Sequence, residues 1–313
     1  MVRWWQSTAM LRLTGLVLSV ATVLNGQAAR RSFTFERDVQ TSSVWREIPR
    51  WDGAQLVGYE HNDSAGPIVY TIDRDGRRDE FLFTFEGGAR IRIFNIAGSP
   101  DGEIAVVGSA YTDDSRFTTF LARVASDRKS QVITRTWPYV PRVTTFAPDG
   151  TTWTIGGLKN EENTRDVPGH FVRHFDRTGK VIGSSTVRVR GPELGGEEVS
   201  ILRSSRDRLG WVTQDGEYIE FSLDGAETGR WDLPGHAGFL ETTGFALSDQ
   251  NDVIVGRFGK GHAELLELDR DAQTWARVTL PKDYTPSWAW IMGFDGTTLV
   301  ADCNAGTLRR FNR

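Results

Sequence analysis

The chain has 313 residues, enough for one large all-β domain or for two domains of ordinary size. Its formal charge of −4 gives no basis for proposing nucleic acid or an anionic membrane as a partner. Cys303 is the single cysteine, which excludes an intramolecular disulfide. The 33 glycines and 11 tryptophans suit a protein with many turns and many packed strands.

The first 28 residues have the pattern of a secretory signal peptide. Arg3 and Arg12 give a positive start, residues 13–24 form an apolar core, and Gly26 and Ala28 supply small residues before a cleavage point. Such a short apolar core cannot cross a bilayer, so we expect no stable membrane insertion. We therefore predict a leader over residues 1–28, a single domain over 29–313, and a secreted or periplasmic protein.

The rest of the chain repeats one pattern: an apolar strand, a tight turn containing aspartate, and a second apolar strand. Examples are "SPDGEIAVVG" from Ser99 and "APDGTTWTIG" from Ala147. The six turn aspartates are Asp52, Asp101, Asp149, Asp207, Asp249 and Asp295. Each of the first five units continues with a third strand, a second turn and a fourth strand, and the side chains alternate with a period of two. Four antiparallel strands repeated in this way predict the blades of a β-propeller.

The sixth unit ends on its third strand, residues 307–311, and has no fourth strand after it. A strand pattern at residues 31–40 lies before the first complete unit, where Phe33 and Phe35 alternate with polar neighbours. We expect these two segments to pair, because pairing removes two exposed sheet edges. The predicted fold is all-β: a six-bladed propeller with four antiparallel strands per blade, closed by an N-terminal strand that completes the last blade.

The turns "SPDG" and the strand ending "FDRTGKVIG" resemble those of the six-bladed propeller superfamily that includes NHL-repeat and TolB-type proteins. The resemblance covers nearly all of the chain after the leader. It implies the fold and leaves the chemistry open, because these turns belong to the architecture.

Two metal sites are weighed and set aside. The turn "DRDGRRD", with Asp73, Asp75 and Asp79, lacks the glycine position and the alternating oxygens of a calcium loop, so we expect a hairpin turn. Gluconolactonase-like propellers, which we weigh as an alternative, hold a divalent metal in the central channel, and the acids on the expected channel-facing strands here are Glu47, Glu197, Glu198 and Glu241. Their sequence motifs do not match, so we assign no metal or other cofactor and keep Ca²⁺ as an alternative.

We assign no metal-binding or catalytic role to the histidines or to any nucleophilic residue. His170 and His174 lie four apart on one predicted strand, which places them on the same side but about 13 Å apart. They cannot hold one metal ion together. No catalytic triad, P-loop or dinucleotide fingerprint occurs in a suitable context.

Long connections rich in aromatic residues are the remaining clue to function, since loops on a rigid scaffold often carry it. In a propeller the fourth-to-first and second-to-third connections open on one face, around the channel mouth. The predicted ligand-binding residues there are Trp45, Tyr59, Tyr111, Trp137, Tyr139, Arg142, Tyr284 and Trp288. Tyr, Trp and Arg are the residue types that anchor interfaces.

We therefore predict a non-catalytic binding module for a peptide, a glycan or a protein, and no enzyme activity is assigned. Two alternatives stay open: a metal-dependent hydrolase or lyase of the lactonase type, and a structural scaffold of the cell envelope.

Overall fold

The computed structural model describes the chain in fourteen segments. They are residues 32–40, 50–51, 55–61, 66–73, 75–114, 116–160, 166–189, 200–213, 216–234, 241–259, 262–281, 290–294, 298–304 and 307–313. Within these segments all regular elements are β-strands, and none of the described residues forms a helix with the length and apolar character needed to cross a membrane.

The described strands form six four-stranded sheets, each antiparallel throughout. The first sheet contains β2 (Arg50–Trp51), β3 (Leu56–Glu60), β4 (Ile68–Ile72) and β5 (Arg78–Leu82). The second contains β6 (Gly88–Gly98), β7 (Ile104–Thr112), β8 (Phe117–Val124) and β9 (Gln131–Arg135). The third contains β10 (Tyr139–Phe146), β11 (Thr152–Lys159), β12 (Asp166–Phe175) and β13 (Val181–Val187).

The remaining three sheets follow in chain order. The fourth contains β14 (Ile201–Ser204), β15 (Arg208–Val212), β16 (Glu217–Ser222) and β17 (Glu227–Asp232). The fifth contains β18 (Glu241–Leu247), β19 (Val253–Gly259), β20 (His262–Asp269) and β21 (Thr274–Arg277). The sixth contains β22 (Trp290–Phe294), β23 (Thr298–Asn304), β24 (Thr307–Asn312) and β1 (Thr34–Gln40), in the order β1-β24-β23-β22.

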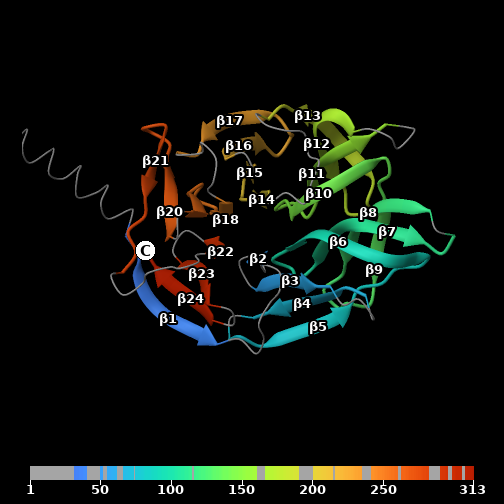
Figure 1. The fold of residues 1–313 in the computed structure, drawn as a ribbon, viewed down its shortest axis with the longest axis horizontal. Helices are drawn as coiled ribbons and strands as arrows, with labels where there is room; N and C mark the ends of the chain where they lie inside the picture. Colours follow the sequence, from blue (N-terminus) through green and yellow to red (C-terminus); the bar gives the residue numbers. More distant parts are fainter. Residues whose placement is uncertain are drawn as a thin grey trace, which may run out of the picture.

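The sheets stand side by side around a common centre (Figure 1). The first strand of each sheet lies nearest the centre and contacts the neighbouring sheets, as β10 contacts β6 and β14, and β22 contacts β18 and β2. The architecture is therefore an all-β propeller with four-stranded antiparallel blades. Inner strands such as β7 are buried almost continuously, because neighbouring sheets cover both faces of each sheet.

The expected pairing of the N-terminal strand with the last strand is confirmed. β1 lies antiparallel to β24, with Thr34 opposite Asn312 and Gln40 opposite Thr307, and the two strands lie side by side in Figure 1. Phe33 is buried, and its backbone N–H donates to the carbonyl of Thr279 at 3.1 Å. Phe35 is less well covered: its side chain is 50% exposed, and its ring lies edge to face with that of Phe311.

The predicted hairpin turn at Asp73 is confirmed. The Asp73 carboxylate accepts hydrogen bonds from the backbone N–H groups of Asp75 and Arg77, both at 2.9 Å. Gly76 has a φ of 86°, a conformation that favours glycine. The Asp73 side chain therefore closes the turn by bonding to backbone N–H groups within it, as expected for aspartate in such loops.

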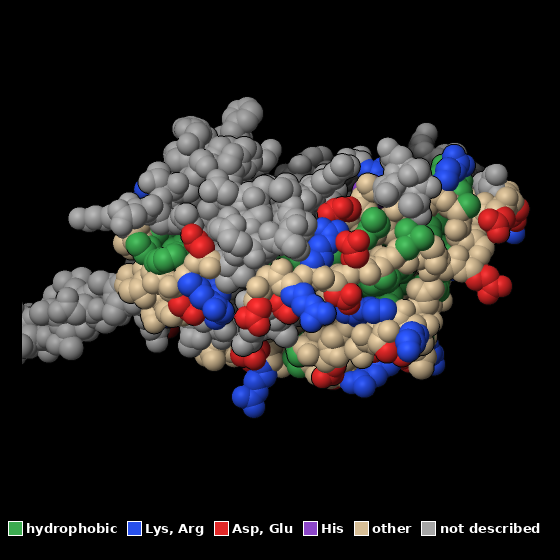
Figure 2. Space-filling model, turned by 90° about the horizontal axis from the view of Figure 1, so that it is seen from below, with side chains coloured by type: hydrophobic (Ala, Val, Ile, Leu, Met, Phe, Trp, Pro, Cys, Tyr) green, Lys and Arg blue, Asp and Glu red, His purple; other side chains and the backbone are tan. Residues whose placement is uncertain are grey.

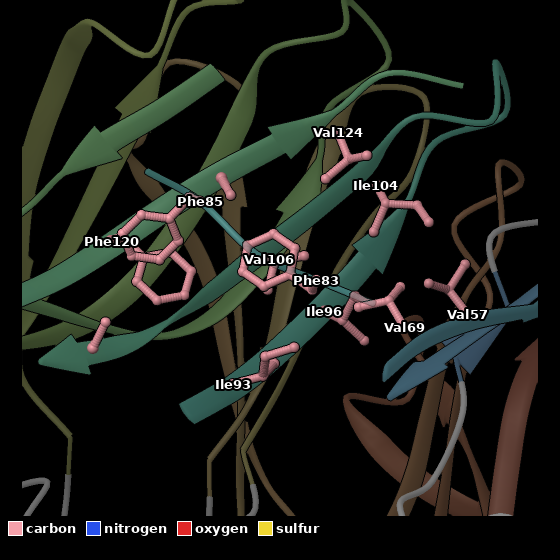
Figure 3. Close-up of a cluster of buried hydrophobic side chains, with 12 residues drawn as sticks. Val57, Val69, Phe83, Phe85, Ile93, Ile96, Ile104, Val106, Phe120 and Val124 are labelled. Carbon is pink, nitrogen blue, oxygen red and sulfur yellow. The ribbon is translucent and has the colours of Figure 1, made fainter. Parts of the chain in front are cut away.

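Hydrophobic clusters between neighbouring sheets hold the blades together. Figure 3 shows one of them, in which Val57 and Val69 of the first sheet pack against side chains of the second. Phe83 and Phe120 stack with ring centroids 5.8 Å apart, and Phe85 lies 5.0 Å from Phe120. Burying each such aromatic side chain contributes about 1.5–3 kcal/mol. The core is therefore distributed around the ring between adjacent sheets.

Charged side chains of both signs intermingle on the side of the molecule seen in Figure 2. Over the described residues of that side, Lys and Arg lie next to Asp and Glu, so positive or negative charge does not gather into one large field. This distribution agrees with the small net charge of the sequence.

Candidate functional site

Four side chains form a row across one end of the second sheet, one from each strand or its end. Arg90 comes from β6, Tyr111 from β7 and Phe117 from β8, and Trp137 lies two residues after the end of β9. The rings of Tyr111 and Phe117 lie 5.7 Å apart, and those of Phe117 and Trp137 lie 5.3 Å apart, both edge to face. The Arg90 guanidinium carbon lies 4.5 Å from the centroid of the Tyr111 ring. We call these four residues the aromatic row.

The local backbone explains why the row forms. Tyr111 and Phe117 are directly opposed partners in the β7–β8 hairpin, so their rings meet on one face. Arg90 lies where the β6–β7 register shifts and has a φ of 45°, so it departs from the regular strand. Trp137 lies in a turn closed by a 2.8 Å hydrogen bond from Tyr139 N–H to the Thr136 carbonyl, and its bond to Pro138 is cis.

The row is open to solvent in its middle. Tyr111 is 40% exposed and Phe117 38% exposed, while Trp137 is half-buried. Single exposed apolar residues are common on protein surfaces, but contiguous exposed aromatic rings mark interaction sites. The three rings offer apolar area with few rotatable bonds, and such area anchors interfaces.

A polar hairpin tip borders the row. Asp114 accepts hydrogen bonds from Arg116 and from the Thr112 hydroxyl, and these bonds hold the pKa of its carboxyl well below the ordinary range. Both Asp114 and Arg116 are exposed, so water screens the pair. The border is therefore charged and hydrated, with the apolar rings inside it.

Tyr139 was expected on the same surface, and this expectation is wrong. Its side chain is fully buried, and its hydroxyl lies 2.8 Å from the Thr154 hydroxyl and 3.2 Å from the Phe171 carbonyl. The Arg173 guanidinium covers its ring at 4.2 Å. Burial raises the pKa of Tyr139 well above its ordinary value. Tyr139 is a core residue of the third sheet and is not accessible to a ligand.

Tyr59 and Arg142 meet around Phe94, which the sequence did not single out. The Tyr59 hydroxyl donates to the Phe94 carbonyl at 3.3 Å, and the Arg142 guanidinium carbon lies 4.7 Å from the Phe94 ring centroid. Phe94 and Arg142 occupy register shifts in the innermost strands β6 and β10. A bulge re-aims the side chain of its extra residue, which brings these two together across adjacent sheets. All three side chains are half-buried.

Other predicted residues lie outside the described part of the chain. They are Trp45, Tyr284 and Trp288 among the predicted ligand-binding residues, and Glu47, Glu197 and Glu198 among the acids considered for a channel metal. Among the described residues, no group of three or more His, Cys, Asp or Glu side chains has the placement to hold a metal ion. The channel metal stays an untested prediction.

The two histidines of β12 have separate environments. His170 is buried with its ring 5.2 Å from that of Trp211, and burial lowers the pKa of its imidazole. His174 stacks on Trp153 at 4.0 Å, and its Nε2 lies 2.6 Å from the Thr151 hydroxyl. Burial also lowers the pKa of His174, against the opposing effect of Asp149. Each histidine therefore packs against a tryptophan, and the two have no shared partner among the contacts described.

A second cluster with Tyr, Trp and Arg lies between the fourth and fifth sheets. Glu220 is 2% exposed and accepts hydrogen bonds from the Tyr218 hydroxyl at 2.6 Å, Arg208 at 3.2 Å and Arg270 at 2.9 Å. Trp231 stacks on Tyr218 with centroids 5.6 Å apart. Burial and the neighbouring carboxylate raise the pKa of Tyr218. We call this set the Glu220 cluster. Its members bond to one another and to adjacent groups, since Arg270 also donates to the Asn251 carbonyl and the Trp231 indole N–H donates to Gln273.

The fold and these surfaces define the class of the protein as an all-β propeller with four-stranded antiparallel blades. No family model and no curated protein matches the sequence. Similar solved structures include TolB from Acinetobacter baumannii, at 12% identity and a TM-score of 0.50, with 85% of this chain and 65% of that chain covered. Another is a Mycobacterium tuberculosis puromycin-hydrolyzing peptidase, at 14% identity and a TM-score of 0.50.

The second match covers 89% of this chain and 54% of the peptidase chain. This chain thus spans under two thirds of the length of both proteins. At these identities the similarity shows the propeller fold alone. The neighbours agree with the predicted propeller fold, and the resemblance to TolB-type and NHL-repeat proteins stays a prediction.

Proposed function

We propose that this protein is a non-catalytic binding module that holds an extended segment of a partner protein along the aromatic row. The observation that supports it is the contiguous set of rings formed by the exposed Tyr111 and Phe117 and the half-buried Trp137, with Arg90 at one end. Tyr, Trp and Arg dominate the energetics of protein interfaces. The rings are already held in place by the sheet, which reduces the entropy lost on binding.

A protein ligand is favoured over a glycan by the way the row is packed. A sugar ring stacks on an open aromatic face and needs free hydrogen-bonding groups beside it. Here the Arg90 guanidinium covers one face of Tyr111, and the nearby Asp114 is already bound by Arg116 and Thr112. Apolar side chains of a peptide can pack against the parts of the three rings that Arg90 leaves uncovered, and they need no free hydrogen-bonding groups.

The scaffold for this function is proposed to be a closed ring of six blades. The six sheets, the contacts between their innermost strands and the β1–β24 pair support this closure. We further propose that residues 1–28 direct secretion and that the mature domain acts outside the cytoplasm. N-terminal sequencing of protein from its native host would give Ala29 as the first residue; intact Met1 on the folded protein would contradict this.

Selection of peptides from a random library displayed on phage tests the proposed site. Immobilised native protein is the bait, and the enriched peptides are then tested for binding to the double variant Tyr111→Ala/Phe117→Ala. The control variant is Phe35→Ala, which removes a somewhat more exposed ring from β1. Peptides that bind the native protein and the control, but not the double variant, support the site. Enriched peptides that bind all three proteins equally, or a failure to enrich any, would contradict it.

A further inference from the structure

The outer strands of the sheets differ in how well their open edges are protected. β5 (RDEFL), β9 (QVITR), β17 (ETGRWD), β21 (TWAR) and β1 (TFERDVQ) each contain at least one charged side chain. β13 (VIGSSTV) contains neither a charged residue nor proline. Charged residues and proline on an edge strand prevent another strand from pairing with it. β13 is the described outer strand that lacks both.

The edge of β13 is also exposed and apolar at its start. Val181 is 41% exposed and Ile182 51% exposed. β13 pairs with β12 on one side, and among the described strands no other lies along its second edge. The β12–β13 register shifts at Ile182, so the regular part of the edge runs over residues 183–187.

Both ends of β13 are fixed to neighbouring sheets. Before the strand, the Gly179 carbonyl accepts a hydrogen bond from the Thr134 hydroxyl of β9 at 3.0 Å. After it, the Arg188 carbonyl accepts one from Arg230 of β17 at 2.9 Å. An edge held in this way is already in the conformation that a new strand would need, which lowers the entropic cost of adding one.

The charges at the two ends indicate the kind of strand that would fit. Lys180 precedes β13 and Arg188 follows it, and both are exposed. The nearby Asp176 carboxylate accepts hydrogen bonds from backbone N–H groups of its own turn, including that of Lys180. A second copy of β13 would place Lys180 against Arg188 in antiparallel pairing, or against its own equivalent in parallel pairing. Like charges oppose both arrangements.

We propose that β13 is a second docking surface, which accepts an extended strand of a partner protein that is uncharged in its middle and acidic at both ends. Main-chain hydrogen bonds to residues 183–187 would supply the affinity, and Lys180 and Arg188 would select the acidic flanks. This surface uses no residue of the aromatic row, so it stands or fails separately from the proposed function.

Two synthetic peptides test the assignment: acetyl-EETVTVTVEE-amide and its lysine-flanked twin, acetyl-KKTVTVTVKK-amide. We expect the acidic peptide to bind the full-length protein at least about fivefold more tightly, because two exposed ion pairs each contribute modestly. The double variant Lys180→Glu/Arg188→Glu should reverse this order. The charge-matched control Arg37→Glu/Arg206→Glu changes exposed positions on other sheets and should keep it.

Backbone pairing is tested on the peptide, so that the protein remains unchanged. Alternate N–H groups of an added strand face β13, and the others face solvent. N-methylation of one alternate set should abolish binding, and methylation of the other set should leave it intact. Equal binding of the acidic and basic peptides, binding of neither, equal effects of the two methylations, or a dimer of the native protein that Lys180→Glu alone strengthens would each overturn the proposal.

Discussion

The aromatic row and the Glu220 cluster use the same residue types for opposite purposes. In the Glu220 cluster a buried carboxylate accepts hydrogen bonds from Tyr218, Arg208 and Arg270, and Trp231 stacks on the tyrosine. In the aromatic row the rings contact one another edge to face and remain open to solvent. Composition alone therefore does not distinguish a binding surface from a joint between blades. Burial and the partners of the polar groups distinguish them.

The largest effect is expected where an aromatic side chain is buried at the β1–β24 seam. Phe33→Ala should lower the free energy of unfolding by about 3–5 kcal/mol, because it removes a buried ring and leaves a cavity. Phe35→Ala, two residues away and half exposed, should change it by about 1 kcal/mol or less. Denaturant unfolding of both variants measures the difference. Equal losses would show that exposure does not separate structural from surface rings in this fold.

A somewhat smaller loss is expected from the Glu220 cluster itself. Glu220→Ala leaves Arg208 and Arg270 without their shared buried partner, and breaking a buried ion pair costs about 3–5 kcal/mol. Both arginines are partly exposed, so we expect a loss near about 3 kcal/mol. Asp114→Ala, which breaks the solvent-exposed pair with Arg116, should leave the free energy of unfolding nearly unchanged, because water screens that pair. If Glu220→Ala unfolded with the same free energy as the native protein, the Glu220 cluster would not stabilise the contact between the fourth and fifth sheets.

The sequence predicted much of the fold because the side-chain pattern that indicates a strand lies within that strand. The turn at Asp73 and the pairing of residues 31–40 with the last strand follow from local pattern and from the need to cover sheet edges. The sequence also predicted Tyr111 and Trp137 as surface residues, and the structure brings them together through Phe117.

The remaining features depend on partners that are distant in the sequence. Trp137 and Tyr139 stand two residues apart in one aromatic segment, yet Tyr139 is buried by Thr154 and Phe171 from other strands. The contact of Arg142 with Phe94 arises from register shifts in two sheets, which a single sequence does not mark. The ion pair of Glu220 with Arg270 joins residues fifty positions apart. Local periodicity carries no information on such pairs.

A smaller effect on stability is expected from pH, through the buried His170, which lies outside the aromatic row. Burial depresses the pKa of His170 in the folded state, while the unfolded chain has the ordinary value of about 6.5. The unfolded state therefore binds more protons, and stability falls as pH drops through about 6.5. His170→Leu should be less sensitive over pH values from about 7.5 to 5.5, as measured by unfolding at each pH. An identical pH dependence of variant and native protein would contradict a buried neutral imidazole.

The smallest effect on stability, and the largest on binding, is expected for Trp137→Ala in the aromatic row. The most direct test titrates a peptide selected on the native protein against this variant and records the melting temperature of the same samples. Loss of an interface anchor costs at least about 2 kcal/mol, or about thirtyfold in affinity. We predict that weakening with a melting temperature within about 2 °C of the native value. Unchanged affinity with a clearly lowered melting temperature would place Trp137 with the Glu220 cluster, as a structural residue, and would contradict the proposed site.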